Sequence, residues 1–159
     1  MPEAARRDRV FLVVVDDSPE LRIALRYACL RAKYGGGRVA LLRVVEEAGT
    51  VEWAGVGAML QEERRDEAEK LLSALAAEVQ EITGGIPILL IREGNPRDEL
   101  LALLEEDPRM SILILATAAN GSGPGPLITA LTGRYAPRLR VPMTIVPGTL
   151  DEKDLERVT

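Results

Sequence analysis

The sequence has 159 residues, which is enough for one domain with a hydrophobic core and too few for two. Apolar residues make up 47% and charged residues 28%, a balance that excludes an intrinsically disordered chain. Aromatic residues are only 3% and the net charge is −5, which argues against a nucleic-acid partner or an anionic membrane surface.

The first ten residues, MPEAARRDRV, contain no apolar core of a signal peptide. The longest apolar run, residues 10–15, is too short to cross a bilayer. We therefore expect a cytoplasmic protein without membrane attachment. Five apolar runs predict strands buried on both faces, because Val, Ile and Leu follow one another without polar alternation; they are residues 10–15, 39–45, 86–91, 112–116 and 143–146.

Helices are predicted between these runs from apolar residues at helical spacing and from capping residues. The first predicted helix has Ser18 as N-cap, Pro19 at its first position, and the glycines at 35–37 as its end. The second runs from about 59 to 82. The third begins with Asn95 and Pro96 and ends before Pro108, and the fourth begins near Pro126 and ends at Pro137.

Strict alternation of strands and helices predicts an α/β fold, a single open five-stranded parallel sheet with right-handed crossovers and helices on both faces. We expect one domain at residues 1–150, followed by a polar tail at 151–159 that is either mobile or weakly helical. The connection at residues 49–57, around Trp53, is long enough to be a lid or an interface loop, and an ordinary surface loop is an equal alternative.

The chain contains no histidine, so the commonest general base and the commonest zinc ligand are both missing. This excludes a triad hydrolase and a zinc enzyme and favours a protein without catalytic activity. Cys29, the only cysteine, lies inside the first predicted helix, where we interpret it as a buried apolar residue.

In an open α/β sheet, ligands bind beyond the carboxyl ends of the strands, at the point where the strand order reverses. Asp16 and Asp17 follow the first strand. A carboxylate there binds a ribose hydroxyl or, through water, Mg²⁺. Alternatively, Asp17 and Ser18 only cap the first helix, whereas Asp16 is harder to explain in that way.

The stretch ANGSGPGP, residues 119–126, follows the fourth strand and has the composition of a phosphate-binding turn. Such a turn binds through backbone N–H groups, which proline lacks, so Pro124 and Pro126 remove two donors. Gly121, Ser122, Gly123 and Gly125 still offer N–H donors, and the turn also carries a hydroxyl.

The sequence resembles the universal stress protein family along nearly its whole length. The resemblance is carried by VVVDDSPE with its helix, VALLRVVE, IREGNP and the terminal PMTIVPG. It implies strand order 3-2-1-4-5 and a homodimer through the last strand, bounded by Pro142 and Pro147. Some members bind ATP or AMP with Mg²⁺ and others do not.

The nucleotide-binding members of the family use Gly-x2-Gly-x9-Gly-Ser/Thr after strand four. Counting back from Gly133 places the second glycine at Gly123, but Asn120 stands at the first glycine and Arg134 at the Ser/Thr. A second alignment puts Ala116 and Ala119 at the two glycines, so both alignments break the motif. Arg134 either grips a phosphate or fills the space that a phosphate would need.

By this resemblance Asp16 contacts the nucleoside and Val44 lies beside the adenine. The chemistry of a carboxylate at the end of a strand also makes Asp16 the candidate metal ligand. We predict a non-catalytic, homodimeric regulatory module of the stress response with an altered nucleotide site. The alternative is an ATP or AMP binder that uses Asp16 and the turn at 121–125, with slow hydrolysis. The predicted site residues are Val15, Asp16, Asp17, Val44, Asn120, Gly121, Ser122, Gly123, Gly133 and Arg134.

Overall fold

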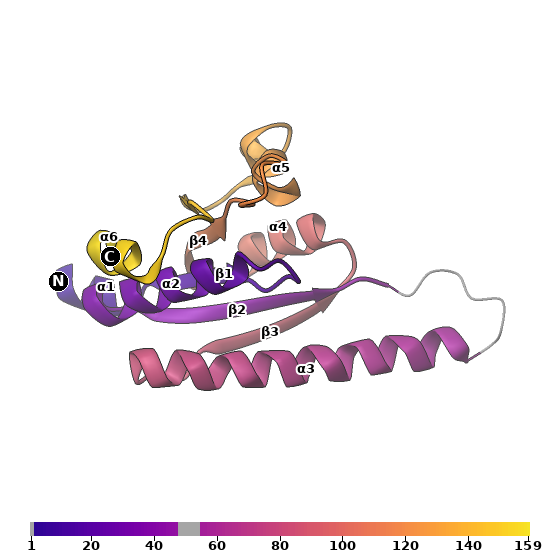
Figure 1. The fold of residues 1–159 in the computed structure, drawn as a ribbon. Coiled ribbons are helices and arrows are strands. Elements are labelled where there is room, and N and C mark those ends of the chain that lie inside the picture. The colour runs from indigo at the N-terminus through magenta and orange to yellow at the C-terminus, as the bar shows by residue number, and fades with distance from the viewer. Residues whose placement is uncertain (1, 48–54) are drawn as a thin grey trace.

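The computed structural model describes residues 2–47 and 55–159. Five parallel strands form one sheet in the order β3-β2-β1-β4-β5, with helices on both faces (Figure 1), so the predicted fold class and strand order are confirmed. The strands are β1 (Val10–Val14), β2 (Arg38–Val45), β3 (Ile88–Glu93), β4 (Met110–Ala116) and β5 (Met143–Val146).

Helices join these strands along the chain, as the alternating pattern predicts. Most of the connection predicted at residues 49–57, including Trp53, lies outside the described residues. The helices are α1 (Pro2–Arg7), α2 (Leu21–Gly35), α3 (Val56–Thr83), α4 (Pro96–Glu106), α5 (Pro126–Thr132) and α6 (Glu152–Val158), with a 3₁₀ turn at Ala136–Arg138.

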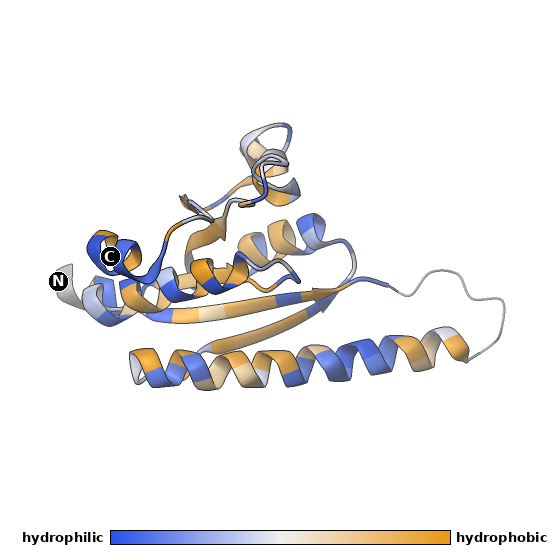
Figure 2. Ribbon diagram, in the orientation of Figure 1, coloured by the Kyte–Doolittle hydropathy of each residue, from blue (hydrophilic) through white to orange (hydrophobic). Residues whose placement is uncertain are grey.

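Strand β1 is buried on both faces, which explains its uninterrupted run of apolar residues. Phe11 and Val13 point into the core that α2 and α3 cover. Leu12 and Val14 point into the opposite core, under α4 and α5. The hydropathy colouring in Figure 2 shows the strands of the sheet as almost continuously hydrophobic, whereas the long helix α3 alternates between hydrophobic and hydrophilic residues.

Helix α3 is longer than the sheet beneath it (Figure 1). Its buried residues are Ala68, Leu72, Leu75 and Val79, and its first twelve residues include none that is buried. The carboxyl-terminal part of α3 therefore packs on the sheet, and its amino-terminal part extends past the carboxyl ends of β1 and β2, where it forms one side of a cavity.

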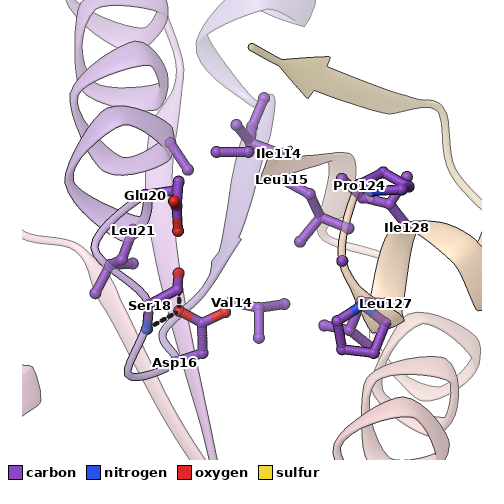
Figure 3. A pocket seen from close by; sticks show the side chains of 14 residues that line it. Val14, Asp16, Ser18, Glu20, Leu21, Ile114, Leu115, Pro124, Leu127 and Ile128 are labelled. Carbon is purple, nitrogen blue, oxygen red and sulfur yellow. Dashed lines mark hydrogen bonds between the residues drawn. The ribbon is translucent and has the colours of Figure 1, made fainter. Parts of the chain in front are cut away.

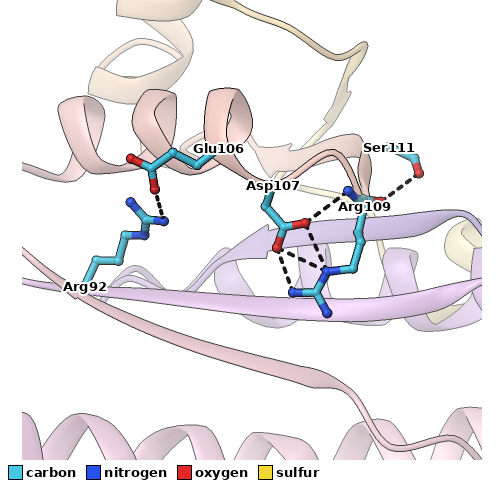
Figure 4. Close-up of polar contacts among 5 residues, drawn as sticks. All are labelled: Arg92, Glu106, Asp107, Arg109 and Ser111. Carbon is cyan, nitrogen blue, oxygen red and sulfur yellow. Dashed lines mark hydrogen bonds and ion pairs between the residues drawn. The ribbon is translucent and has the colours of Figure 1, made fainter.

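The start of β4 contains an irregularity that polar side chains stabilise. The register with β1 shifts between Val10 and Phe11, and the Ser111 hydroxyl accepts the Val10 N–H at 3.0 Å in place of a backbone oxygen. Asp107 holds the preceding turn by accepting from Nε and Nη2 of Arg109 (Figure 4). In the same view, Arg92 of β3 pairs with Glu106, which ties the edge strand to α4.

Three boundaries differ from the prediction for a physical reason. The third strand begins at Ile88 and not at residue 86, because Pro87 has no N–H and the Ile86 carbonyl accepts from Arg38 Nε. The fourth helix ends at Thr132, before Gly133, well short of Pro137. The first helix begins at Leu21, after Ser18 and Pro19, because the Asp16 side chain accepts the N–H and the hydroxyl of Ser18.

The two ends of the chain carry helices. Helix α1 was not predicted, because its sequence, PEAARR, has no apolar periodicity. The last nine residues, expected as a mobile or weakly helical tail, contain the seven-residue helix α6, whose N-cap Asp151 makes a capping box with Asp154. Leu155 is buried in the same core as α2, so α6 covers the edge of that layer.

Candidate functional site

The sheet order reverses at β1, because β2 lies on one side of it and β4 on the other. A cavity of about 640 Å³ opens beyond the carboxyl ends of β1 and β2, and we call it the large cavity. Its size lies within the range of roughly 300–1,000 Å³ typical of small-molecule sites. Its lining includes Asp16, Arg43, Val44, Leu71, Pro96 and Leu127.

Asp16 organises the loop that follows β1. Its Oδ1 accepts hydrogen bonds from the backbone N–H of Ser18 at 2.9 Å and from the Ser18 hydroxyl at 2.6 Å. This is an Asx turn, which holds Ser18 outside the helix. Ser18 is therefore not the N-cap that the sequence predicted; Glu20 occupies that position, without a side-chain cap.

Arg43 of β2 fixes the same loop from the other side. Its Nη1 donates to the Val15 carbonyl and its Nη2 to Asp17 Oδ1, both at 3.0 Å. Asp17 is thereby held by an arginine and does not cap the helix. The sequence contains a signal for Arg43, because it is the one charged residue within the apolar run VALLRVV.

A second, smaller cavity of about 70 Å³ lies between the start of α2, the end of β4 and the start of α5 (Figure 3), and we call it the small cavity. Asp16, Ser18 and Glu20 give it a polar side, as Figure 3 shows, and apolar residues that include Ile114 and Leu127 form the rest. The two cavities adjoin, because both are lined by Val14, Asp16, Pro126 and Leu127.

Glu20, like Arg43, is a residue of this site that the sequence did not predict. Its side chain is buried, with 8% of the residue exposed, and its Oε1 accepts the backbone N–H of Ala119 at 2.9 Å. This hydrogen bond is the main cause that lowers the pKa of the Glu20 carboxyl below its ordinary value. A contact between residues 99 positions apart leaves no local signal in a sequence.

The predicted residues of the glycine-rich turn, 120–123, are exposed and line neither cavity. The Asn120 side chain accepts from the backbone N–H and the hydroxyl of Ser122, so the turn is closed on itself. Gly121 and Gly123 have φ values of +78° and +98°, which only glycine adopts readily. Their role in the structure is to shape the turn.

Arg134 and Gly133 lie at the end of α5, away from both cavities. Arg134 is exposed, and its guanidinium lies 5.7 Å from the centre of the Tyr135 ring. The other arginine near this ring is Arg97, at 4.1 Å. Of the predicted site residues, the structure therefore brings together Val15, Asp16, Asp17 and Val44, and it keeps Arg134 outside.

Neither a metal cluster nor a membrane-spanning helix is found in the described part of the chain. Within residues 2–47 and 55–159, no three side chains of Asp, Glu or Cys are grouped as metal ligands. None of the helices in these ranges combines the length and the apolar character needed to cross a bilayer. Asp16 as a ligand of Mg²⁺ therefore stays a prediction.

Comparison with protein-family models matches residues 9–147 to the universal stress protein family. A comparison with curated protein sequences finds no match. Among solved structures, universal stress protein UspA from Lactobacillus plantarum is similar with a TM-score of 0.72 and 17% identity, over 88% of this chain and 98% of that one.

Two further similar structures contain nucleotides. A universal stress protein family protein from Arabidopsis thaliana with AMP bound has a TM-score of 0.58 and 13% identity, over 87% of this chain and 91% of its own. A universal stress protein in complex with cAMP has a TM-score of 0.55 and 17% identity, over 89% and 98%. At these identities the similarity to each structure establishes the fold alone.

Proposed function

Because the chain belongs to the universal stress protein family, we propose that it is a cytoplasmic, non-catalytic regulatory module of the stress response whose large cavity receives the nucleoside part of an adenine compound. The observation that carries this proposal is the large cavity itself, of about 640 Å³, with a carboxylate on its wall at the switch point of the sheet.

The chemistry of the large cavity suits a nucleoside. Val44 and Leu71 provide apolar surface for a flat base, and Asp16 stands where the acid of many α/β sites binds ribose hydroxyls. Both local hydrogen bonds to Asp16 reach Oδ1, so its other oxygen is placed to accept from a ligand hydroxyl. That two relatives of the same fold hold AMP and cAMP supports this choice of ligand class.

The surroundings favour binding without catalysis. Phosphoryl transfer depends on cations that neutralise the charge developing on the phosphate. Among the described residues, two arginines line the large cavity, and both are engaged by the protein. Arg43 holds Asp17 and Val15, and Arg64 donates to the Glu46 carbonyl at 3.3 Å. The whole chain also lacks a histidine that would serve as a general base.

The experiment is a titration with adenosine, AMP and ATP, with and without Mg²⁺, followed by calorimetry and by the shift in melting temperature. We expect adenosine to bind and the Asp16→Asn variant to bind it at least about tenfold more weakly, because a charged acceptor for the ribose is lost. Asp8→Asn, an exposed change at the opposite end of β1, is the matched control. Failure of adenosine to bind at millimolar concentration, or measurable ATP turnover, would contradict the proposal.

We also propose that the module is a homodimer in which two β5 strands pair. Strand β5 forms hydrogen bonds only with β4 in the described sheet, so its outer edge presents unpaired backbone groups. Ile145 on this strand is 41% exposed. A symmetric pairing of two such edges would cover both the backbone groups and this side chain.

The other edge of the sheet provides a matched control for the dimer. Leu89 of β3 is 42% exposed, almost the same as Ile145. We expect sedimentation to give a dimer for the wild type and for Leu89→Lys, and a monomer for Ile145→Lys. A monomeric wild type, or dissociation by the β3 variant alone, would refute pairing through β5.

A further inference from the structure

Glu20 is the one charged residue that is buried in the described part of the chain. Gly148 makes room for it, because a Cβ atom at that position would lie 2.8 Å from Glu20 Cγ. Through the Ala119 N–H, its carboxylate joins the start of α2 to the loop after β4. Burial of a charge is costly unless hydrogen bonds compensate for it, and the Ala119 N–H supplies such a hydrogen bond here.

The backbone donors near Glu20 are the groups that an external anion would use. The loop after β4 lies at the carboxyl edge of the sheet, where backbone N–H groups bind anions in open α/β folds. The protein itself uses four of them: Thr117 N donates to Val146 O, Ala118 N to Pro124 O, Ala119 N to Glu20 and Ser122 N to Asn120. Pro124 and Pro126 have no N–H to offer.

The small cavity is also negatively charged. Asp16 and Glu20 line it together, and none of its described lining residues is lysine or arginine. Its volume of about 70 Å³ has room for only a few water molecules. Since the large cavity continues into it past Asp16, a phosphate chain on a bound nucleoside would meet two carboxylates there.

We propose that the Glu20 carboxylate is an internal anion that occupies the anion position of the switch point, so that the site accepts nucleosides and rejects nucleoside polyphosphates. Glu20 thereby determines the ligand class. The acceptance of nucleosides rests on the proposed function. The rejection of phosphate does not, because it follows from the charge of the small cavity and from the bond between Glu20 and the Ala119 N–H.

The test compares adenosine, ATP and inorganic tripolyphosphate on the wild type and two variants, with Kd measured by calorimetry. Glu20→Gln retains the shape of the side chain and an oxygen that accepts from Ala119 N–H, but removes the charge. Glu20→Ala also frees the Ala119 N–H and the space that the Glu20 side chain occupies. Glu81→Gln, an exposed change of the same charge on α3, is the control, and circular dichroism verifies that each variant is folded.

For the wild type we expect adenosine to bind more tightly than ATP, and tripolyphosphate not to bind. The ratio of the ATP Kd to the adenosine Kd should fall at least about tenfold in Glu20→Gln and further in Glu20→Ala, with no change in the control. Tripolyphosphate should bind to Glu20→Ala. If Glu20→Ala does not fold, the ratio of the ATP Kd to the adenosine Kd in Glu20→Gln tests the proposal by itself.

The two proposals fail in different ways. A gain of tripolyphosphate binding in Glu20→Ala without adenosine binding in any form would uphold the role of Glu20 and overturn the nucleoside proposal. Adenosine binding with an unchanged ATP-to-adenosine ratio in Glu20→Gln would uphold the nucleoside and overturn the role of Glu20. Wild-type protein that binds ATP as tightly as adenosine would likewise overturn it.

Discussion

Replacement of Gly148 by alanine creates the closest steric conflict at any glycine of the described structure. The added Cβ would lie 1.9 Å from the Thr117 carbonyl oxygen and 2.8 Å from Glu20 Cγ, against ordinary contacts of 3.4–4 Å. The ends of β4 and β5 must therefore separate by about 1.5 Å (3.4 − 1.9). Gly148 N also donates to Thr117 Oγ1 at 3.0 Å, a bond that this separation would break.

We expect Gly148→Ala to destabilise the protein by about 2–4 kcal/mol, from overpacking of about 1–3 kcal/mol and one lost hydrogen bond of about 1 kcal/mol. For a chain of this size, this corresponds to a melting temperature about 5–12 °C lower. Urea unfolding followed by circular dichroism measures it.

Gly85→Ala is the matched control for this prediction. The nearest atom to its added Cβ is Thr83 Oγ1, at 3.7 Å, and its φ is not positive. The control should leave stability unchanged or raise it by up to about 1 kcal/mol. A Gly148→Ala protein as stable as the wild type, or an equal loss in the control, would show that the close approach of the two strand ends does not constrain the fold.

Three other predictions concern single side chains. Arg43→Met should lower the unfolding free energy by about 1–2 kcal/mol in urea titrations, because the Val15 carbonyl and Asp17 both lose their donor. Asp107→Asn should destabilise more at pH 7 than at pH 3. The hydrogen bond from Arg109 holds the pKa of Asp107 below its ordinary 3.8, so the stabilisation is fully present above 3.8 and is lost as the pH falls through the lowered pKa. Burial raises the pKa of the Cys29 thiol to about 12, so Ellman's reagent at pH 8 should label the unfolded protein and not the native one.

The fold could be predicted because its determinants are local. Strands buried on both faces produce runs such as VFLVVV, and glycines and prolines separate these runs from the helices. The errors arise where a side chain competes with the backbone. Asp16 takes the N–H and hydroxyl of Ser18, so the helix that Ser18 and Pro19 predict starts two residues after Pro19, at Leu21.

The candidate site could be predicted only on the side that one stretch of sequence builds. Val15, Asp16 and Asp17 follow one another along the chain, and Val44 lies on the adjacent strand. Glu20, in contrast, depends on Ala119 and on the space left by Gly148, both about a hundred residues or more away. The place of Arg134 in a motif predicts a phosphate ligand or a block, and the structure puts its side chain beside Tyr135.

The glycine-rich turn shows why the number of glycines is a poor measure of anion binding. An anion is bound by N–H groups that have no other acceptor, and glycine only permits the backbone conformations that expose them. Here Gly121, Gly123 and Gly125 have positive φ values in open space, while four N–H groups of residues 117–122 donate to acceptors within the protein. One of those acceptors is itself an anion, the Glu20 carboxylate. A loop of this composition therefore needs an account of where each donor points before it can be assigned a phosphate, and here one donor, the Ala119 N–H, is already taken by a carboxylate that lines the small cavity.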